Sequence, residues 1–81
     1  MDNTQKLIDV FRSALGMPDE VDIPSLKYRG IKEWDSVGHM QLVAAIETEF
    51  DVMLETSDIL EMSSFVKAVE LLQKQNVSFS P

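Results

Sequence analysis

The amino-acid sequence predicts an all-α fold, a bundle of four helices with a long first loop and a short third helix. Two observations predict it. Apolar residues recur at helical spacing in three segments of the chain, and residue types that start or stop helices lie at the ends of these segments. The chain has 81 residues and no cysteine. We therefore expect a single domain over residues 1–75 that is held together by apolar packing alone.

The first helix is predicted over residues 3–15. Asp2 and Gln5 have the spacing of a capping box, and Gly16 followed by Pro18 is a stop signal. The apolar positions fall on one helical face: Leu7, Ile8, Phe11, Ala14 and Leu15. Residues 17–35 show no sustained period, and we expect an ordered loop whose apolar residues, Trp34 among them, anchor it to the core.

The second helix is predicted from Ser36 to about Asp51, with Asp35 or Ser36 as its N-cap. Its inner face is expected to hold Met40, Val43, Ile46 and Phe50. Gly38 lies in the first turn, where glycine weakens a helix by up to about 1 kcal/mol relative to alanine.

A short third helix is predicted over residues 56–61, starting at Thr56 or Ser57, with Asp58 near its positive end. Ser63 or Ser64 should cap a fourth helix over residues 64–74. The inner face of that helix would hold Phe65, Ala68, Val69 and Leu72. Residues 76–81 carry no anchoring pattern, and we expect this C-terminal tail to fray.

The charge of the chain is strongly negative and unevenly placed. Fourteen acidic residues outnumber seven basic ones, which gives a net charge of −7 and makes nucleic acid and anionic membranes poor partners. Eight acids lie between Lys32 and Lys67, where there is no Lys or Arg: Glu33, Asp35, Glu47, Glu49, Asp51, Glu55, Asp58 and Glu61. This segment forms either a solvated face or a docking surface for basic partners. No apolar run suits a membrane span, and the lack of cysteine fits a cytoplasmic protein.

Conventional catalytic and metal sites find little support. Asp35, Ser36 and His39 could suggest a catalytic triad, but the strand–turn–helix context of such a nucleophile is missing. We interpret His39 as a solvated or partner-facing helix residue. The stretch from Asp19 to Asp22 lacks the later ligands of a calcium loop, and one histidine without cysteine excludes a conventional zinc site. The sequence predicts no metal site and a protein that is not an enzyme.

Ser36 has a second possible role at the start of its helix. Free N–H groups and the helix dipole favour negative charge there, so a phosphate ester on this hydroxyl would lie in a suitable field, offset in part by Asp35 and Glu33. The residue could also be an ordinary N-cap, and among serines at helix starts caps far outnumber modification sites. Local chemistry alone therefore favours the cap.

The segment Trp34-Asp35-Ser36-Val37-Gly38-His39-Met40 and the helix that follows it to Asp51 resemble the D-S-L segment and second helix of acyl carrier proteins. The resemblance extends from the first helix to Leu72. It implies the four-helix fold of the acyl-carrier type. It also implies that Ser36 carries 4′-phosphopantetheine, transferred from coenzyme A by a phosphopantetheinyl transferase, and that acyl groups are held as thioesters on the terminal thiol of that arm.

The same resemblance assigns partners and further residues. Acyl-activating, acyl-transferring or condensing enzymes of a fatty-acid, polyketide or other specialised pathway would dock on a monomeric carrier. The residues that it implies for docking are Asp35, Val37, Met40, Glu47 and Asp51, and those for the core or acyl pocket are Val43, Ile46, Phe50, Leu54, Ile59 and Val69. A peptidyl or D-alanyl carrier is an alternative of the same family. A small acidic protein-interaction module without a prosthetic group is an alternative of another class.

The sequence departs from general fatty-acid carriers around the serine. Trp34 replaces a small residue, Gly38 and Gln41 replace acids, and Thr48 interrupts the acidic end of the helix. The pattern is more similar to discrete carriers of specialised pathways. Gly38 is hypothesised to permit close approach of an enzyme or of the arm.

Overall fold

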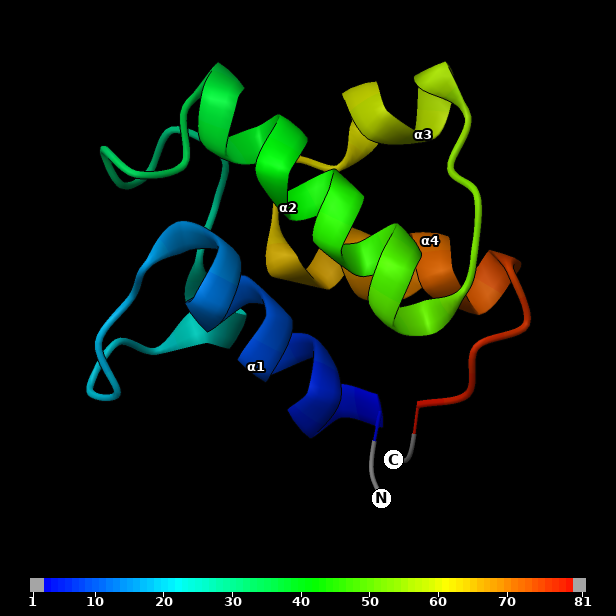
Figure 1. Ribbon diagram of the computed structural model, residues 1–81, viewed down its shortest axis with the longest axis horizontal. Helices are drawn as coiled ribbons and strands as arrows, with labels where there is room; N and C mark the ends of the chain where they lie inside the picture. The colour runs from blue at the N-terminus through cyan, green and yellow to red at the C-terminus, as the bar shows by residue number, and fades with distance from the viewer. Residues whose placement is uncertain (1–2, 80–81) are drawn as a thin grey trace.

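The computed structural model describes residues 3–79, and these form helices joined by loops, without a strand (Figure 1). The order along the chain is α1 (Asn3–Leu15), a 3-10 turn η1 (Ile23–Ser25), α2 (Ser36–Phe50), α3 (Thr56–Glu61) and α4 (Phe65–Lys74). The predicted all-helical fold, the long first loop and the short third helix are confirmed. The arrangement is compatible with a small helical bundle.

Local capping chemistry sets most helix ends. The first helix stops at Gly16, whose φ of 66° is left-handed, as at many helix ends. The N-cap of α2 is Asp35, not Ser36. The N-cap of α4 is Ser64, not Ser63, and its hydroxyl accepts a hydrogen bond from the Lys67 N–H at 3.1 Å. α2 ends at Asp51, a C-cap with a left-handed φ of 54°. The expected cap at Asp2 lies outside the described residues.

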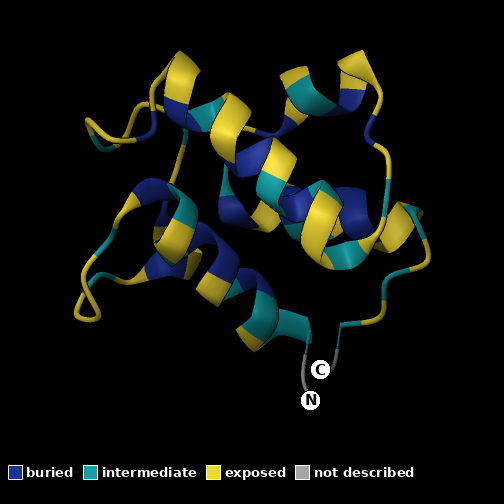
Figure 2. Ribbon diagram, viewed as in Figure 1, coloured by how far each residue is buried: buried dark blue, intermediate teal, exposed yellow. Residues whose placement is uncertain are grey.

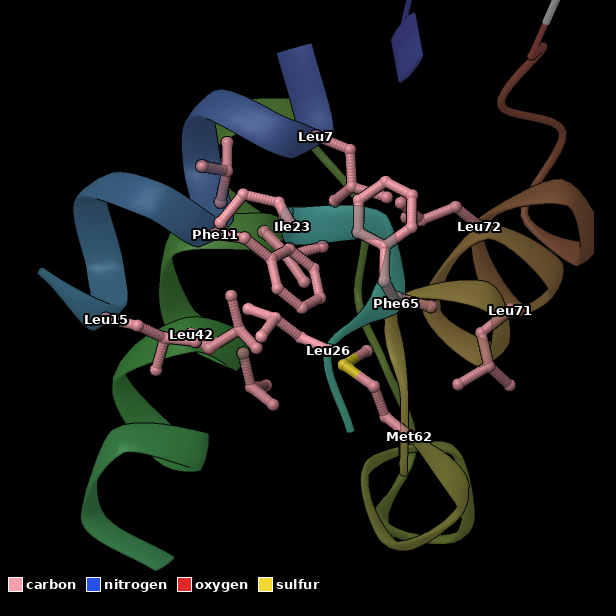
Figure 3. Packing of buried hydrophobic residues seen from close by; sticks show 14 of the residues in the cluster. Leu7, Phe11, Leu15, Ile23, Leu26, Leu42, Met62, Phe65, Leu71 and Leu72 are labelled. Atoms are coloured by element: carbon pink, nitrogen blue, oxygen red, sulfur yellow. The ribbon is translucent and has the colours of Figure 1, made fainter. Parts of the chain in front are cut away.

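The core lies where α1 packs against α2 and where η1 contacts both α1 and α4 (Figures 2 and 3). Phe11 is at its centre, edge-on to Trp34 and to Phe65 with ring centroids 5.3 and 5.1 Å apart. Such edge-to-face pairs add to the stabilisation that burial of the rings provides.

The residues predicted for the core divide by burial. Val43, Ile46 and Leu54 are buried, whereas Phe50, Ile59 and Val69 are partly buried and pack against the cluster. The prediction that Met40 belongs to the inner face is wrong, because its side chain is 55% exposed. Trp34 is fully buried, which confirms its expected role as the anchor of the first loop.

Hydrogen bonds from two directions order the first loop. The Arg12 guanidinium donates to the carbonyls of Pro18, Asp19 and Val21 at 3.2–3.3 Å. In its middle, the loop pairs with the start of α4: the Tyr28 N–H donates to the Ser63 carbonyl at 2.8 Å and the Phe65 N–H to the Leu26 carbonyl at 3.1 Å. Closer to α2, the Arg29 N–H donates to the Trp34 carbonyl at 3.0 Å.

The C-terminal tail contacts the helices as far as residue 79. The Ser78 carbonyl accepts a hydrogen bond from the Asn3 side-chain amide at 2.7 Å, and the Phe79 ring lies 6.5 Å from that of Phe50. Val77 and Phe79 are partly buried against the core. Residues 77–79 therefore have contacts with α1 and α2 that the sequence did not predict, whereas fraying of the tail stays a prediction. Residues 80–81 lie outside the described residues.

Candidate functional site

Ser36 is the first residue of α2 and is exposed to solvent. The Asp35 carboxylate accepts the hydrogen bond from the Gly38 N–H at 2.9 Å, so the capping role belongs to Asp35. Within residues 3–79 the Ser36 hydroxyl takes part in no side-chain hydrogen bond. Its position combines an accessible hydroxyl with the positive end of a helix.

Large apolar side chains are exposed next to this serine and on the short third helix. Val37 is 66% exposed and Met40 55% exposed, both within the first two turns of α2, and Leu60 on α3 is 79% exposed. Apolar side chains in contact with water are available for a partner to cover. The structure therefore leaves the predicted docking residues Val37 and Met40 accessible.

The eight clustered acids do not all point to solvent. Six are exposed: Glu33, Asp35, Glu49, Asp51, Glu55 and Glu61. Glu47 is partly buried, and its Oε2 accepts from the Leu54 N–H at 2.9 Å, which holds the loop between α2 and α3. Asp58 is buried, accepts from the Glu55 N–H at 3.2 Å and lies 3.9 Å from the Lys74 ammonium. For Glu47, predicted as a docking residue, the structure supplies an internal role.

Gly38 is buried, and the reason for a glycine here is internal. A Cβ at this position would collide with the backbone carbonyl oxygen of Glu33 and would lie 3.3 Å from Leu15 Cδ2. The hypothesis that Gly38 makes room for an enzyme or for the arm is replaced by a simpler one. The glycine lets the loop before Ser36 pass close over the first turn of α2.

The interpretation of His39 as a solvated residue is wrong. His39 is partly buried; its Nδ1 accepts from the Trp34 indole N–H at 2.9 Å, and its Nε2 lies 2.8 Å from the Ile59 carbonyl oxygen. An indole N–H is only a donor and a carbonyl only an acceptor. These partners require a neutral imidazole with its proton on Nε2. Because both nitrogens are engaged, His39 has no free nitrogen to act as a base on Ser36.

Hollows at the surface of residues 3–79 bear on the prediction of a pocket. One of about 370 Å³, directly before Ser36, is lined by Arg29, Gly30, Ile31, Lys32, Trp34 and Asp35. Another, of about 850 Å³, lies between α1 and α2 and includes Ala14, Ala44 and Ala45. None of the residues predicted for an acyl pocket lines either hollow. The basic residues of the first hollow were missed by the sequence reasoning, although the spacing of Lys27, Arg29 and Lys32 marks a cationic stretch in an acidic chain.

Residues 3–79 contain no group of three or more acidic or histidine side chains placed to hold a metal ion. Within the same range, no helix combines the length and apolar character that crossing a membrane requires. The chain matches no protein-family model and no curated protein sequence.

Proposed function

We propose that this protein is a carrier of the acyl-carrier type, modified at Ser36 with 4′-phosphopantetheine. The observation that carries the proposal is the exposed Ser36 hydroxyl at the first position of α2, left free because the Asp35 carboxylate caps the helix. The helical bundle and the W-D-S-x-x-H-M segment support the same assignment.

The residues around Ser36 suit a phosphodiester. The dipole of the 15-residue α2 favours negative charge at its first turn, and the exposed Arg29 and Lys32 border the hollow directly before the serine. In the loading reaction, Ser36 Oγ would form a bond to the phosphorus that bears pantetheine and lose its proton. The pyrophosphate bond of coenzyme A would break, and adenosine bisphosphate would leave. When bound, the group supplies a thiol that carries cargo as a thioester.

The surface next to Ser36 suits a partner with an apolar centre and basic surroundings. Val37, Met40 and Leu60 offer exposed apolar side chains. The exposed carboxylates of Glu33 and Asp35 near the serine, and of Asp51 at the far end of α2, supply the negative charge that would steer a basic enzyme surface. A transferase and cargo-loading enzymes of this kind are the proposed partners, and their docking should weaken as salt rises.

The test is a loading experiment. The folded protein is incubated with coenzyme A and a broad-specificity phosphopantetheinyl transferase, and its intact mass is measured. We expect a gain of one phosphopantetheine group in the wild type and none in Ser36→Ala. Ser57→Ala, which removes another exposed serine near the start of a helix, is the matched control and should load normally.

The outcomes separate the function classes. Absence of loading by every competent transferase, despite a native helical circular dichroism spectrum, would refute the carrier function and favour the acidic interaction module. Once loading is established, a panel of acyl- and aminoacyl-activating enzymes identifies the cargo. Selective charging with an amino acid would assign the protein to the peptidyl or D-alanyl carriers instead.

A further inference from the structure

The side chain of His39 joins three segments that are separate in the sequence. His39 itself is part of α2. Its Nδ1 accepts a hydrogen bond from the indole of Trp34, which anchors the first loop, and its Nε2 lies 2.8 Å from the carbonyl oxygen of Ile59 in α3. The Trp34 and His39 rings are inclined by only 22°. We call this arrangement, from the Trp34 indole through the His39 imidazole to the Ile59 carbonyl, the His39 bridge.

The short third helix depends on such contacts. A helix of six residues has almost no stability of its own, so tertiary contacts must hold it. Its last turn contains no basic residue, and the Ile59 carbonyl is one of the C-terminal carbonyls that lack a partner four residues on. That carbonyl accepts only a long backbone hydrogen bond from the Met62 N–H, at 3.4 Å, and the His39 imidazole supplies a second and shorter partner at 2.8 Å.

A second polar contact joins α3 to α4 instead of α2. Asp58 lies 3.9 Å from Lys74 on α4, and the Lys74 side chain is 68% exposed. An ion pair of this length, whose lysine is largely solvent-exposed although Asp58 is buried, contributes little. The His39 bridge is shorter and partly buried, and it connects α3 to the end of α2 that bears Ser36. His39 is three residues after Ser36, about 4.5 Å along the helix axis.

We infer that His39 is a positioning residue that fixes α3 against the Ser36-bearing end of α2. Ser36, Met40 and the exposed Leu60 of α3 are thereby presented as one surface. The structural part of this inference stands alone, whereas its consequence for enzyme docking rests on the proposed function.

Three variants test the bridge on the unmodified protein. His39→Phe keeps a ring but removes both hydrogen bonds. His39→Gln keeps an acceptor and a donor whose separation is similar to that of the two imidazole nitrogens. Lys74→Gln removes the α3–α4 ion pair and is the matched control.

The readout is amide hydrogen exchange of Ile59 and Met62 in and after α3, compared with that of Phe11 in α1. Loss of two hydrogen bonds should accelerate exchange around α3 by at least about fivefold more than exchange in α1. His39→Gln and Lys74→Gln should remain within about twofold of the wild type. Equal acceleration of α1 and α3 in His39→Phe would overturn the inference, and so would a Gln variant that behaves like the Phe variant.

A measurement on the wild type covers the case in which His39→Phe does not fold. Imidazole ¹⁵N shifts should show a neutral ring protonated on Nε2 at pH 7.5. A ring protonated on Nδ1 would refute the bridge. The loading assay adds the functional consequence: transfer to Ser36 should slow in His39→Phe and recover in His39→Gln. If the wild type does not load, the carrier proposal fails while the exchange result still decides the bridge.

Discussion

Replacement of Gly38 by alanine should destabilise the fold, although propensity alone predicts the opposite. In a helix, alanine is favoured over glycine by about 1 kcal/mol. At this position, however, the new methyl would overlap the Glu33 carbonyl oxygen and press on Leu15 Cδ2 at 3.3 Å. The Glu33 carbonyl oxygen belongs to the backbone and directly precedes Trp34, whose side chain is fully buried. Because Trp34 anchors this part of the loop, the carbonyl has little freedom to move away from the new methyl group.

The magnitude follows from these two opposing contributions. Overpacking of a filled interior costs about 1–3 kcal/mol, and displacement of anchored backbone belongs to the upper part of that range. After the gain from propensity is subtracted, Gly38→Ala should lower the free energy of unfolding by about 2 kcal/mol. For a domain of this size that loss corresponds to a fall in Tm of about 8–16 °C.

The assay is urea and thermal unfolding followed by helical circular dichroism. Ala44→Gly, at an exposed position of the same helix, is the control and should lose about 1 kcal/mol through propensity alone. We therefore expect both Gly38→Ala and Ala44→Gly to be destabilising, although one replaces glycine by alanine and the other replaces alanine by glycine. A Gly38→Ala protein as stable as the wild type, or more so, would show that the close approach of the loop is not what requires glycine.

Three further predictions concern other contacts. Asp35→Ala should cost about 1 kcal/mol through loss of the cap on the Gly38 N–H, whereas Asp35→Asn should retain most of it; equal losses in urea unfolding would contradict the capping role. Glu47→Ala should destabilise by about 1 kcal/mol and accelerate exchange of the Leu54 amide, its partner at 2.9 Å; an unchanged exchange rate would return Glu47 to the docking residues. Phe79→Ala should lower Tm by several degrees, since the ring packs on the core; an unchanged Tm would show that the tail contributes nothing.

The sequence predicted the elements whose signals are local. Helix boundaries were read from caps and stop residues such as Gly16, Asp35 and Ser64, because capping involves neighbours within about four residues. Core positions such as Val43 and Ile46 followed from helical periodicity. Trp34 was expected to anchor the loop because large apolar residues in an aperiodic segment need burial.

The sequence could not predict contacts between segments. His39, Glu47 and Asp58 are polar residues on helices, and such residues usually face water. The partners of His39 are Trp34 and Ile59, the partner of Glu47 is Leu54, and the distant partner of Asp58 is Lys74. No spacing rule reveals contacts of this kind. The bond from the Glu55 N–H to Asp58 is local and has the three-residue spacing of a capping box. Gly38 was misread for the same reason, since the atom that excludes a methyl belongs to the preceding loop. Met40 follows the helical period but lies at its edge, where burial depends on the neighbouring helix.

The hydrogen bond from Asn3 to the Ser78 carbonyl brings residues 75 positions apart to within 2.7 Å. Because these two residues lie side by side, the segment from Asn3 to Ser78 can be inserted at one point of a host protein without being stretched. It also suits circular permutation, with a short linker that joins Asn3 to Ser78. In a fusion, the position of the cut would decide whether the Ser36 end of α2 faces the host protein or the solvent.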